Sequence, residues 1–317
     1  MANLKVLVTG GAGFIGSHVV DKLVSKGCDV VILDDLSSGR FGNIEAQVAG
    51  KQVRFVQGGI LDEPRVADAI DGVDAVVHLA AIVSVPVSIM FPKETGQTNV
   101  SGTARLLDRC VAKGVSKFVY ASSCAVYGEA RYTPIDEAHP TDPLSPYAES
   151  KLAAEQLVLK DHGRDLQSIA LRLFNVYGAR QASREYAGVI TAFKERLSAG
   201  RPLEIYGDGL QTRDFVYVSD VSAAFWRALV SQDQGLFNIC TGKAATIKEL
   251  AEVMVELAGQ PDAKPLFKPR RAGDILHSHG TYAKAKKALG YEPTVSLRNG
   301  LSKLMEDGVL PSGSECS

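Results

Sequence analysis

Three glycines between the first apolar strand and the first helix constrain the fold of this chain most strongly. The segment reads Val-Leu-Val-Thr-Gly-Gly-Ala-Gly-Phe-Ile-Gly-Ser and contains Gly10, Gly13 and Gly16. The first glycine permits a tight turn, the second lets the backbone approach a pyrophosphate, and the third lets the helix pack closely on the strand. Free N–H groups at the start of the helix then face the phosphates. The segment therefore predicts a dinucleotide-binding loop.

An acidic residue at the end of the second predicted strand adds to this loop. Asp34 lies eighteen positions after Gly16, where a carboxylate accepts hydrogen bonds from the adenosine ribose hydroxyls. An acid there repels a 2′-phosphate, so the sequence favours NAD over NADP. Asp35 is placed to share this role, and an ordinary turn aspartate is the alternative for Asp34. Asp62, after Gly-Gly-Ile-Leu, is a candidate contact for the adenine amino group.

Short β-branched runs alternate with helical stretches through the first half of the chain. Strands are predicted at 5–9, 30–33, 53–57, 75–78, 117–121 and 168–173, and helices at 14–26, 64–70, 94–113 and 146–161. Repeated strand–helix–strand units imply an α/β fold with a parallel, doubly wound sheet of the Rossmann type.

The alternation of strands and helices becomes less regular after Gly178, where proline and glycine are more frequent. Strands near 203–205, 215–218 and 236–239 are separated by helices, which indicates a smaller α/β substrate domain. We therefore expect a dinucleotide-binding domain at 1–178 and a substrate domain at 179–310, with part of 211–240 returning to the main sheet.

The composition excludes several classes of partner. A net charge of −1 over 317 residues provides no basic field for nucleic acid or an anionic membrane. No apolar run reaches the length of a membrane helix, and the first strand begins too early for a signal peptide. The five cysteines are scattered and odd in number, which argues for a reducing cytoplasm and against disulfides or a metal site.

Tyr147 and Lys151 are the candidate catalytic pair. They lie four residues apart on a helix that Ser145 caps and Pro146 begins, so they share one face, with about 6 Å between their Cβ atoms. An ammonium beside the phenol favours the phenolate and pulls the tyrosine pKa from about 10 toward neutrality. The pair then predicts a base that works at physiological pH. The alternative is an exposed Tyr and Lys on an amphipathic helix.

Several ordered motifs join the glycine loop to this pair. They include Ala-Ser-Ser-Cys-Ala-Val-Tyr-Gly at 121–128, Tyr-Ala-Glu-Ser-Lys at 147–151, Arg-Leu-Phe-Asn-Val-Tyr-Gly at 172–178, Thr-Arg-Asp-Phe at 212–215 and Arg-Ala-Gly-Asp at 271–274. With them the chain resembles the extended short-chain dehydrogenases/reductases from about residue 5 to residue 300. Within that superfamily it most resembles the UDP-hexose 4-epimerases.

The resemblance implies a role for each matched residue. Ser123 holds the reacting sugar hydroxyl, with Ser122 as the adjacent alternative; Tyr147 is the base, and Lys151 binds the nicotinamide ribose. A tightly bound NAD is expected at Gly10, Gly13, Phe14, Ile15, Gly16, Asp34, Asp35, Ile60, Asp62, Leu79, Ala80, Ala81, Asn99, Tyr147 and Lys151. The UDP-sugar substrate is expected at Ser123, Tyr147, Asn175, Val189, Tyr206, Arg213, Arg271, Asp274 and Ser278.

The implied reaction interconverts UDP-hexoses at sugar carbon 4 through a 4-keto intermediate. Related dehydratases and decarboxylases carry acidic residues after the active serine or threonine, where this chain has Cys124 and Ala125. The alternatives are another nucleotide-sugar enzyme, such as a dehydratase, decarboxylase or reductive epimerase, and a non-catalytic NAD-sensing protein. Cys124 resembles a catalytic cysteine of GDP-sugar 3,5-epimerising relatives, and its alternative is a small apolar filler.

The resemblance also bears on the sugar and on assembly. Ser278 falls where a tyrosine is associated with restriction to UDP-glucose and UDP-galactose. A small residue there leaves room for an N-acetyl group, so UDP-N-acetylglucosamine and UDP-N-acetylgalactosamine are expected substrates as well. Family members usually pair as homodimers through two helices, which correspond here to those containing Leu106 and Tyr147.

Overall fold

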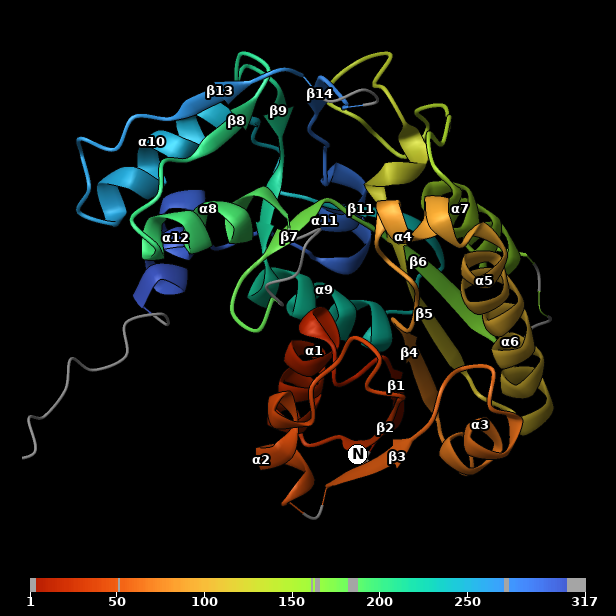
Figure 1. The fold of residues 1–317 in the computed structure, drawn as a ribbon. Coiled ribbons are helices and arrows are strands. Elements are labelled where there is room, and N and C mark those ends of the chain that lie inside the picture. The colour runs from red at the N-terminus through yellow and green to blue at the C-terminus, as the bar shows by residue number, and fades with distance from the viewer. Residues whose placement is uncertain are drawn as a thin grey trace, which may run out of the picture.

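A seven-stranded parallel sheet forms the centre of the computed structural model of the chain (Figure 1). The structure describes residues 4–50, 52–160, 162, 166–181, 188–270 and 274–306. The strand order is β11-β6-β5-β4-β1-β2-β3, and neighbouring strands are parallel. The strands are β1 Lys5–Thr9, β2 Asp29–Asp34, β3 Val53–Gln57, β4 Ala75–His78, β5 Lys117–Ser123, β6 Gln167–Leu173 and β11 Gly235–Ile239. The predicted Rossmann-type α/β fold is confirmed.

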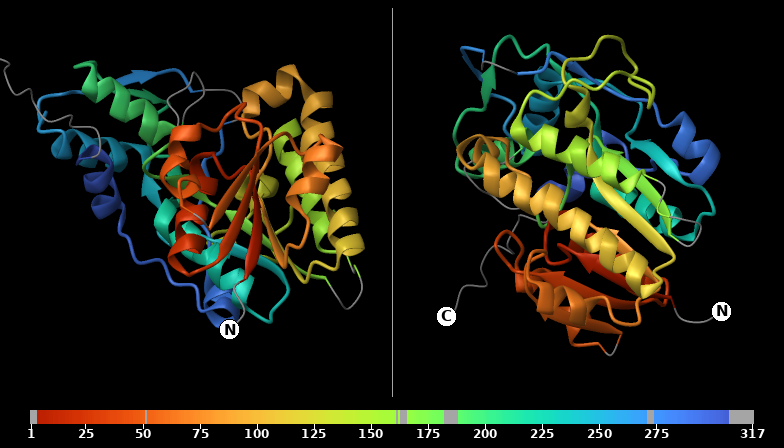
Figure 2. Two further views of the ribbon diagram at one scale, coloured as in Figure 1. Left: turned by 90° about the horizontal axis from the view of Figure 1, so that it is seen from below. Right: turned by 90° about the vertical axis from the view of Figure 1, so that its right-hand side faces the viewer.

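Helices cover both faces of this sheet (Figure 2). One layer holds α1 (Phe14–Ser25), α9 (Val218–Val230) and α11 (Ala283–Leu289), and the other holds α3 (Glu63–Ala69), α6 (Gly102–Lys113) and α7 (Pro146–Val158). Successive strand residues point to opposite faces. Accordingly Val6 and Val8 pack in one core and Leu7 in the other. Burial on both faces explains why the strands are apolar throughout.

A second lobe packs beside the carboxyl edge of the sheet, and its core includes Phe193, Leu203, Leu250, Met254 and Leu301. Its helices are α8 Val189–Ser198, α10 Ile247–Leu257 and α12 Leu297–Glu306. Its strands pair as β10 (Phe215–Tyr217) with β7 (Asn175–Tyr177), β13 (Leu266–Lys268) with β8 (Glu204–Tyr206), and β9 (Thr212–Arg213) with both β12 (Ala245–Thr246) and β14 (His277–Ser278).

Two segments that follow the start of this lobe belong to the layers of the main sheet. Helix α9 packs on α1, and β11 pairs with β6. The chain therefore crosses between the two lobes more than once, while the domain boundary near residue 178 stays a prediction. Among the described helices, none is long and apolar enough to cross a membrane.

The helix predicted at 94–113 differs from the structure. It consists of α5 (Pro92–Gly96), a π-helical turn (Gln97–Ser101) and α6. The Thr103 hydroxyl donates to the Asn99 carbonyl at 2.6 Å, and the Asn99 side chain accepts from the Ile82 amide at 2.8 Å. The Thr103 bond gives the Asn99 carbonyl, in the π-helical turn, a side-chain partner outside the regular backbone ladder. Short helices α2 (Glu45–Val48) and α4 (Val85–Met90) complete the layers.

Asp214 ties the second lobe to the sheet. Its carboxylate is fully buried and accepts hydrogen bonds from the Thr241 amide at 2.8 Å, the Thr241 hydroxyl at 2.6 Å and the Gly242 amide at 2.9 Å. A longer bond comes from the Gly280 amide at 3.4 Å. The start of β10, the loop after β11 and the segment after β14 thus meet at one carboxylate, which fixes the neighbouring Arg213.

Candidate active site

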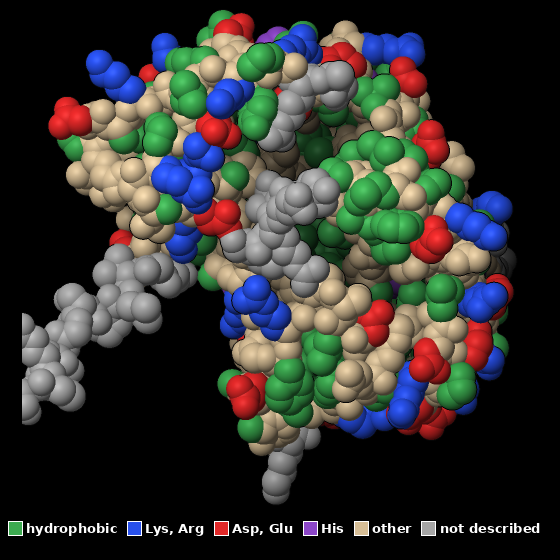
Figure 3. All heavy atoms as spheres, in the orientation of Figure 1, with side chains coloured by type: hydrophobic (Ala, Val, Ile, Leu, Met, Phe, Trp, Pro, Cys, Tyr) green, Lys and Arg blue, Asp and Glu red, His purple; other side chains and the backbone are tan. Residues whose placement is uncertain are grey.

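Two cavities lie at the carboxyl ends of β1 and β4, where the strand order reverses. A doubly wound sheet binds its ligands at such a switch point. The cavities have volumes of about 340 and 410 Å³, and Gly10, Asp34, Ala80 and Ala81 line both of them. The molecular surface is hollowed here, beside the apolar side chains of α4 (Figure 3). We call them the adenosine cavity (340 Å³) and the catalytic cavity (410 Å³).

The glycine loop between β1 and α1 leaves no room for side chains. Gly10 has φ +70°, and a Cβ on it would lie 2.8 Å from the Ala80 nitrogen. A Cβ on Gly16 would lie 2.0 Å from the Gly10 carbonyl oxygen. The loop therefore needs glycine at both positions, and Gly13, Phe14 and Ile15 line the catalytic cavity beside them. This cradle fits a dinucleotide pyrophosphate at the N-terminus of α1.

Backbone N–H groups of two adjacent loops hold the Asp34 carboxylate. Its carboxylate accepts hydrogen bonds from the Ala12 amide at 2.9 Å and the Leu36 amide at 2.8 Å. Burial raises its pKa, and these two N–H groups act in the opposite direction. Asp35 and Ile60 line the same adenosine cavity. The structure thus places these predicted NAD contacts together.

Asp62 lies apart from this group. Its carboxylate caps α3 by accepting from the Arg65 amide at 3.3 Å, and it is not among the residues that line the adenosine cavity. The wall beside it is made instead by residues that sequence reasoning missed. These are Leu33, Ser37, Ser38, Gly58, Gly59, Leu61, Ile82 and Thr98, most of which follow the carboxyl ends of β2, β3 and β4.

Ser123, Tyr147 and Lys151 meet in the catalytic cavity. Ser123 ends β5, while Tyr147 lies in the first turn of α7, whose N-cap Ser145 accepts from the Ala148 amide at 3.2 Å. Ser123 lies beside Tyr147 and acts to lower the pKa of its phenol. The Lys151 ammonium lies 4.3 Å from the centre of the Tyr120 ring. The predicted helix, its cap and its shared face therefore agree with the structure.

The expected direction of the Tyr147 pKa shift is wrong for the polypeptide itself. Burial raises the pKa of Tyr147 to about 12, although Ser123 beside it acts in the opposite direction. Burial also lowers the pKa of Lys151 to about 7, and Glu155 acts in the opposite direction. Both members of the pair are desolvated, so each favours its neutral form. Tyr147 becomes a base at neutral pH only when further positive charge faces it.

The two adjacent serines have different partners. The Ser122 hydroxyl donates to Glu155 Oε2 at 2.6 Å, whereas Ser123 accepts from the Ala125 amide at 3.2 Å and lies beside Tyr147, whose pKa it acts to lower. Both line the catalytic cavity. The geometry therefore assigns the contact with Tyr147 to Ser123.

Asn99 supports the cavity wall from behind. It is 1% exposed, and its amide donates to the Ile82 carbonyl at 3.0 Å and to the Ser150 hydroxyl at 2.9 Å. It is not among the lining residues of either cavity, although Leu79, Ala80 and Ala81 are lining residues of the catalytic cavity. The described structure therefore gives Asn99 a bracing position.

Arg213, Ser278 and Cys124 gather on the other side of Tyr147. Ser278 of β14 is the register partner of Arg213 on β9, and Arg213 Nη2 lies 3.7 Å from Asp274 Oδ1. Ser278 lies beside Cys124, and burial raises the pKa of the Cys124 thiol to about 12. The thiol is therefore neutral at physiological pH.

The remaining predicted substrate residues are more scattered. The Asn175 amide donates to the Asp214 carbonyl at 3.2 Å, beside Arg213. Tyr206 and Asp274 line a separate cavity of about 230 Å³. Val189 is half-buried at the start of α8 and lines none of these three cavities, and Arg271 lies outside the described residues.

Sequence reasoning missed part of the wall of the catalytic cavity. Phe174 and Val176 line it directly after β6, within the matched Arg-Leu-Phe-Asn-Val motif, so that motif could have indicated them. Val83 and Gln181 also line it. Neither residue has a distinguishing pattern in the sequence.

Comparisons with known proteins agree with this geometry. A family model described as the NAD dependent epimerase/dehydratase family matches residues 6–240. A UDP-glucose 4-epimerase of Mycolicibacterium smegmatis is 40% identical over 307 residues, which are 96% of this chain and 98% of that protein. UDP-glucuronic acid decarboxylase 1 of Arabidopsis thaliana is 34% identical over 96% of this chain and 69% of its own length.

Solved structures agree with the same assignment. The UDP-glucose 4-epimerase of Thermotoga maritima, solved with UDP-glucose, has a TM-score of 0.90 and 39% identity, and the match covers 96% of this chain and 98% of that one. A UDP-N-acetylglucosamine 4-epimerase of Methanobrevibacter ruminantium, in complex with UDP-N-acetylmuramic acid, has a TM-score of 0.92 and 33% identity, with the same coverage.

A side chain at Gly16 should remove bound NAD. In Gly16→Ala the new Cβ would meet the Gly10 carbonyl at 2.0 Å, so the loop must move away from the pyrophosphate. We expect NAD affinity to fall at least about tenfold, a loss of about 1.4 kcal/mol. The NAD released from denatured purified protein measures this. Gly42→Ala is the control, because no described atom lies within 4 Å of its Cβ; equal NAD in both variants would contradict the prediction.

The buried Lys151 should make stability depend on pH in protein freed of nucleotide. Its folded pKa of about 7 lies below the unfolded value of about 10.4, so the unfolded chain binds more protons between these pH values. The free energy of unfolding should therefore rise with pH there, by up to about 1.4 kcal/mol per unit from this group. Urea unfolding of wild type and Lys151→Met from pH 7 to about 10 tests this. A stability difference that stays constant across that range would exclude the depressed pKa.

Proposed function

This chain belongs to the NAD-dependent epimerase/dehydratase family, and we propose that it interconverts UDP-hexoses at sugar carbon 4. It is an enzyme of the epimerase type, and NAD is its cofactor. The single observation that carries the proposal is the meeting of Ser123, Tyr147 and Lys151 in the catalytic cavity, with Tyr147 one helical turn from Lys151. UDP-glucose and UDP-galactose are the proposed principal pair, through a 4-keto intermediate.

The site's own residues supply orientation and proton transfer. Ser123 holds the 4-hydroxyl oxygen, and Tyr147 takes its proton and later returns it to the ketone oxygen. Lys151 binds the nicotinamide ribose, and its ammonium favours the Tyr147 phenolate. Bound NAD supplies the hydride acceptor and donor at carbon 4 and, while oxidised, a further positive charge. Proton transfer by a placed side chain is worth about 10²–10⁴ in rate.

The residues after Ser123 favour epimerisation over elimination or decarboxylation. Cys124 is neutral because burial raises its pKa to about 12, and Ala125 has no titratable group. Neither can act as a carboxylic acid beside the sugar. A dehydratase or decarboxylase remains the second candidate, because the match to a UDP-glucuronic acid decarboxylase spans the same part of the chain.

The nucleotide and the sugar are proposed to meet different residues. Arg213 is 16% exposed at its side chain and suits a diphosphate, since a guanidinium fork matches paired oxygens. Asn175 lies beside it, and Asp274 aligns its guanidinium. Ser278 lies beside Cys124, which is close to Tyr147, and we therefore propose that it lies near the sugar. Its small side chain supports acceptance of N-acetylated UDP-hexoses.

We also propose that the chain forms a homodimer through α6 and α7, and that it acts in the cytoplasm. Leu106 packs inside the core from α6, so the opposite face of that helix is available for a partner. Cys28, Cys110 and Cys240 are buried as free thiols, which suits a reducing compartment.

Tyr147→Phe should abolish turnover while preserving the fold. The ring still packs, but no hydroxyl can accept the sugar proton, so kcat for UDP-galactose should fall by at least about 10²-fold. The assay is formation of UDP-glucose from UDP-galactose. Tyr177→Phe is the control, because its hydroxyl donates to the Leu297 carbonyl in the second lobe. An active Tyr147→Phe enzyme would show that another group is the base.

Ser278→Tyr should restrict the enzyme to the smaller sugars. We expect turnover of UDP-N-acetylglucosamine to fall at least about tenfold, because added bulk in a closed pocket costs about 1–3 kcal/mol. Turnover of UDP-glucose should stay near the wild-type value. Ser278→Ala separates the effect of side-chain size from loss of the hydroxyl beside Cys124, and it should keep the wild-type ratio of the two substrates. Unchanged N-acetylated turnover in Ser278→Tyr would remove the role given to Ser278.

A further inference from the structure

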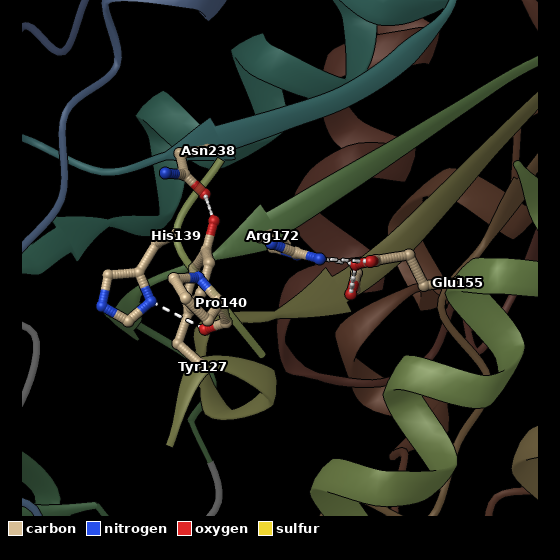
Figure 4. Close-up of polar contacts among 7 residues, drawn as sticks. Tyr127, His139, Pro140, Glu155, Arg172 and Asn238 are labelled. Carbon is tan, nitrogen blue, oxygen red and sulfur yellow. Dashed lines mark hydrogen bonds and ion pairs between the residues drawn. The ribbon is translucent and has the colours of Figure 1, made fainter. Parts of the chain in front are cut away.

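A buried ion pair joins α7 to β6 behind the catalytic cavity. Figure 4 shows Arg172 on β6 pointing at Glu155 on α7. Arg172 donates from Nε to Oε2 at 2.9 Å and from Nη2 to Oε1 at 2.5 Å, and the two side chains are 5% and 3% exposed. Burying two charges costs several kcal/mol per ion, so such a pair is weak evidence for stability. Its place beside the catalytic residues suggests another role.

Ser122 is the third member of this cluster. Its hydroxyl donates to the same Glu155 Oε2 at 2.6 Å. Successive side chains of a strand point to opposite sides, so a fixed Ser122 also fixes the direction of Ser123. We call Ser122, Glu155 and Arg172 the brace.

The brace adds to other contacts between α7 and the end of β5. Tyr147 lies beside Ser123 in the catalytic cavity, and the Lys151 ammonium lies over the Tyr120 ring. Glu155 follows four residues after Lys151, on the same face of the helix. The contact at Glu155 therefore sets how far α7 can slide along β5. The position of Tyr147 relative to Ser123 therefore depends on the contact at Glu155.

Arg172 is itself held from the opposite side. Its guanidinium lies 4.5 Å from the centre of the Tyr127 ring, and the Tyr127 hydroxyl donates to Asn238 Oδ1 at 2.7 Å (Figure 4). Tyr127 ends the 3₁₀ turn Cys124–Tyr127 that follows Ser123. Beyond Tyr127, His139 stacks edge-on at 5.4 Å and bonds to the Pro140 carbonyl. The guanidinium cannot shift without moving this turn.

We propose that Glu155 and Arg172 are positioning residues, which place Ser123 against Tyr147 by holding Ser122. The proposal rests on the function proposed for the Ser123–Tyr147 site. A displacement of about 1 Å in such a site can cost about 10²-fold in rate. The negative charge of Glu155 also opposes the loss of the Lys151 proton that burial favours.

The decisive variant replaces both charges together, as Glu155→Met/Arg172→Met. Exchange of a buried ion pair for apolar side chains of similar size is often neutral or stabilising, so the free energy of unfolding should not fall. We expect kcat nevertheless to drop at least about tenfold while KM stays within about threefold, because Arg213 and the nucleotide contacts are unaffected. A stable variant with wild-type kcat would overturn the proposal.

Ser122→Ala tests the same link with less disturbance, because it leaves the ion pair in place. We expect a comparable loss in kcat, and no further loss when Ser122→Ala is added to the Met/Met variant. A kcat within about twofold of wild type would overturn the proposal even if the Met/Met variant fails to fold. A rise in KM matching that of Ser123→Ala would also overturn it, since Ser122 would then contact the substrate directly.

Asp220→Asn is the matched control for loss of a buried carboxylate. Asp220 lies on α9 and accepts from the Thr294 amide at 3.0 Å and the Thr294 hydroxyl at 2.7 Å, and it lines neither the adenosine cavity nor the catalytic cavity. We expect it to lose stability and keep kcat, the opposite of the Met/Met variant. If the wild type turns over no UDP-hexose, the proposed function fails. The brace is then judged by the Ser123–Tyr147 separation in a crystal structure of Ser122→Ala, where an unchanged separation would overturn it.

Discussion

The catalytic site depends on how helix α7 packs against strand β5. Tyr147, Lys151 and Glu155 lie on one helical face and meet Ser123, the Tyr120 ring and Ser122 in turn. A helix and a strand that slide against each other by one residue would separate all three contacts at once. Arg172 and Tyr127 hold the strand side of this contact, and Ser145 fixes where the helix begins.

Burial determines the electrostatics of the site more than the pairing of Tyr147 with Lys151 does. The spacing alone predicts a depressed tyrosine pKa, yet desolvation raises it to about 12 and lowers that of Lys151 to about 7. Burial favours the neutral forms of both Tyr147 and Lys151, so Tyr147 needs further positive charge nearby to lose its proton. In the proposed mechanism the oxidised cofactor provides that charge, which would link the basicity of Tyr147 to the presence of its reaction partner.

The parts predicted well from the sequence are those that local backbone demands determine. The glycine loop, the N-cap at Ser145 and the parallel sheet follow from residue types at short spacing, and all three are in the structure. The sequence predicts an adenine contact at Asp62, and the structure adds that its carboxylate caps α3; the adenine contact stays a prediction. The sequence predicts one regular helix at 94–113, whereas the structure has a π-helical turn at Gln97–Ser101, where the Asn99 side chain bonds to Ile82, which lies outside the helix.

The sequence by itself determined the dinucleotide loop, the alternation of strands and helices, and the catalytic spacing of Tyr147 and Lys151. These need only neighbours within a few residues, because turns, caps and helix faces are local. Only the tertiary structure decided which of the two serines lies beside Tyr147. It also decided which backbone and side-chain donors bind the Asp214 carboxylate, and that Arg172 is buried against Glu155. Their partners lie 17 to 66 residues away along the chain, and no local pattern specifies which of them will share a low-dielectric interior.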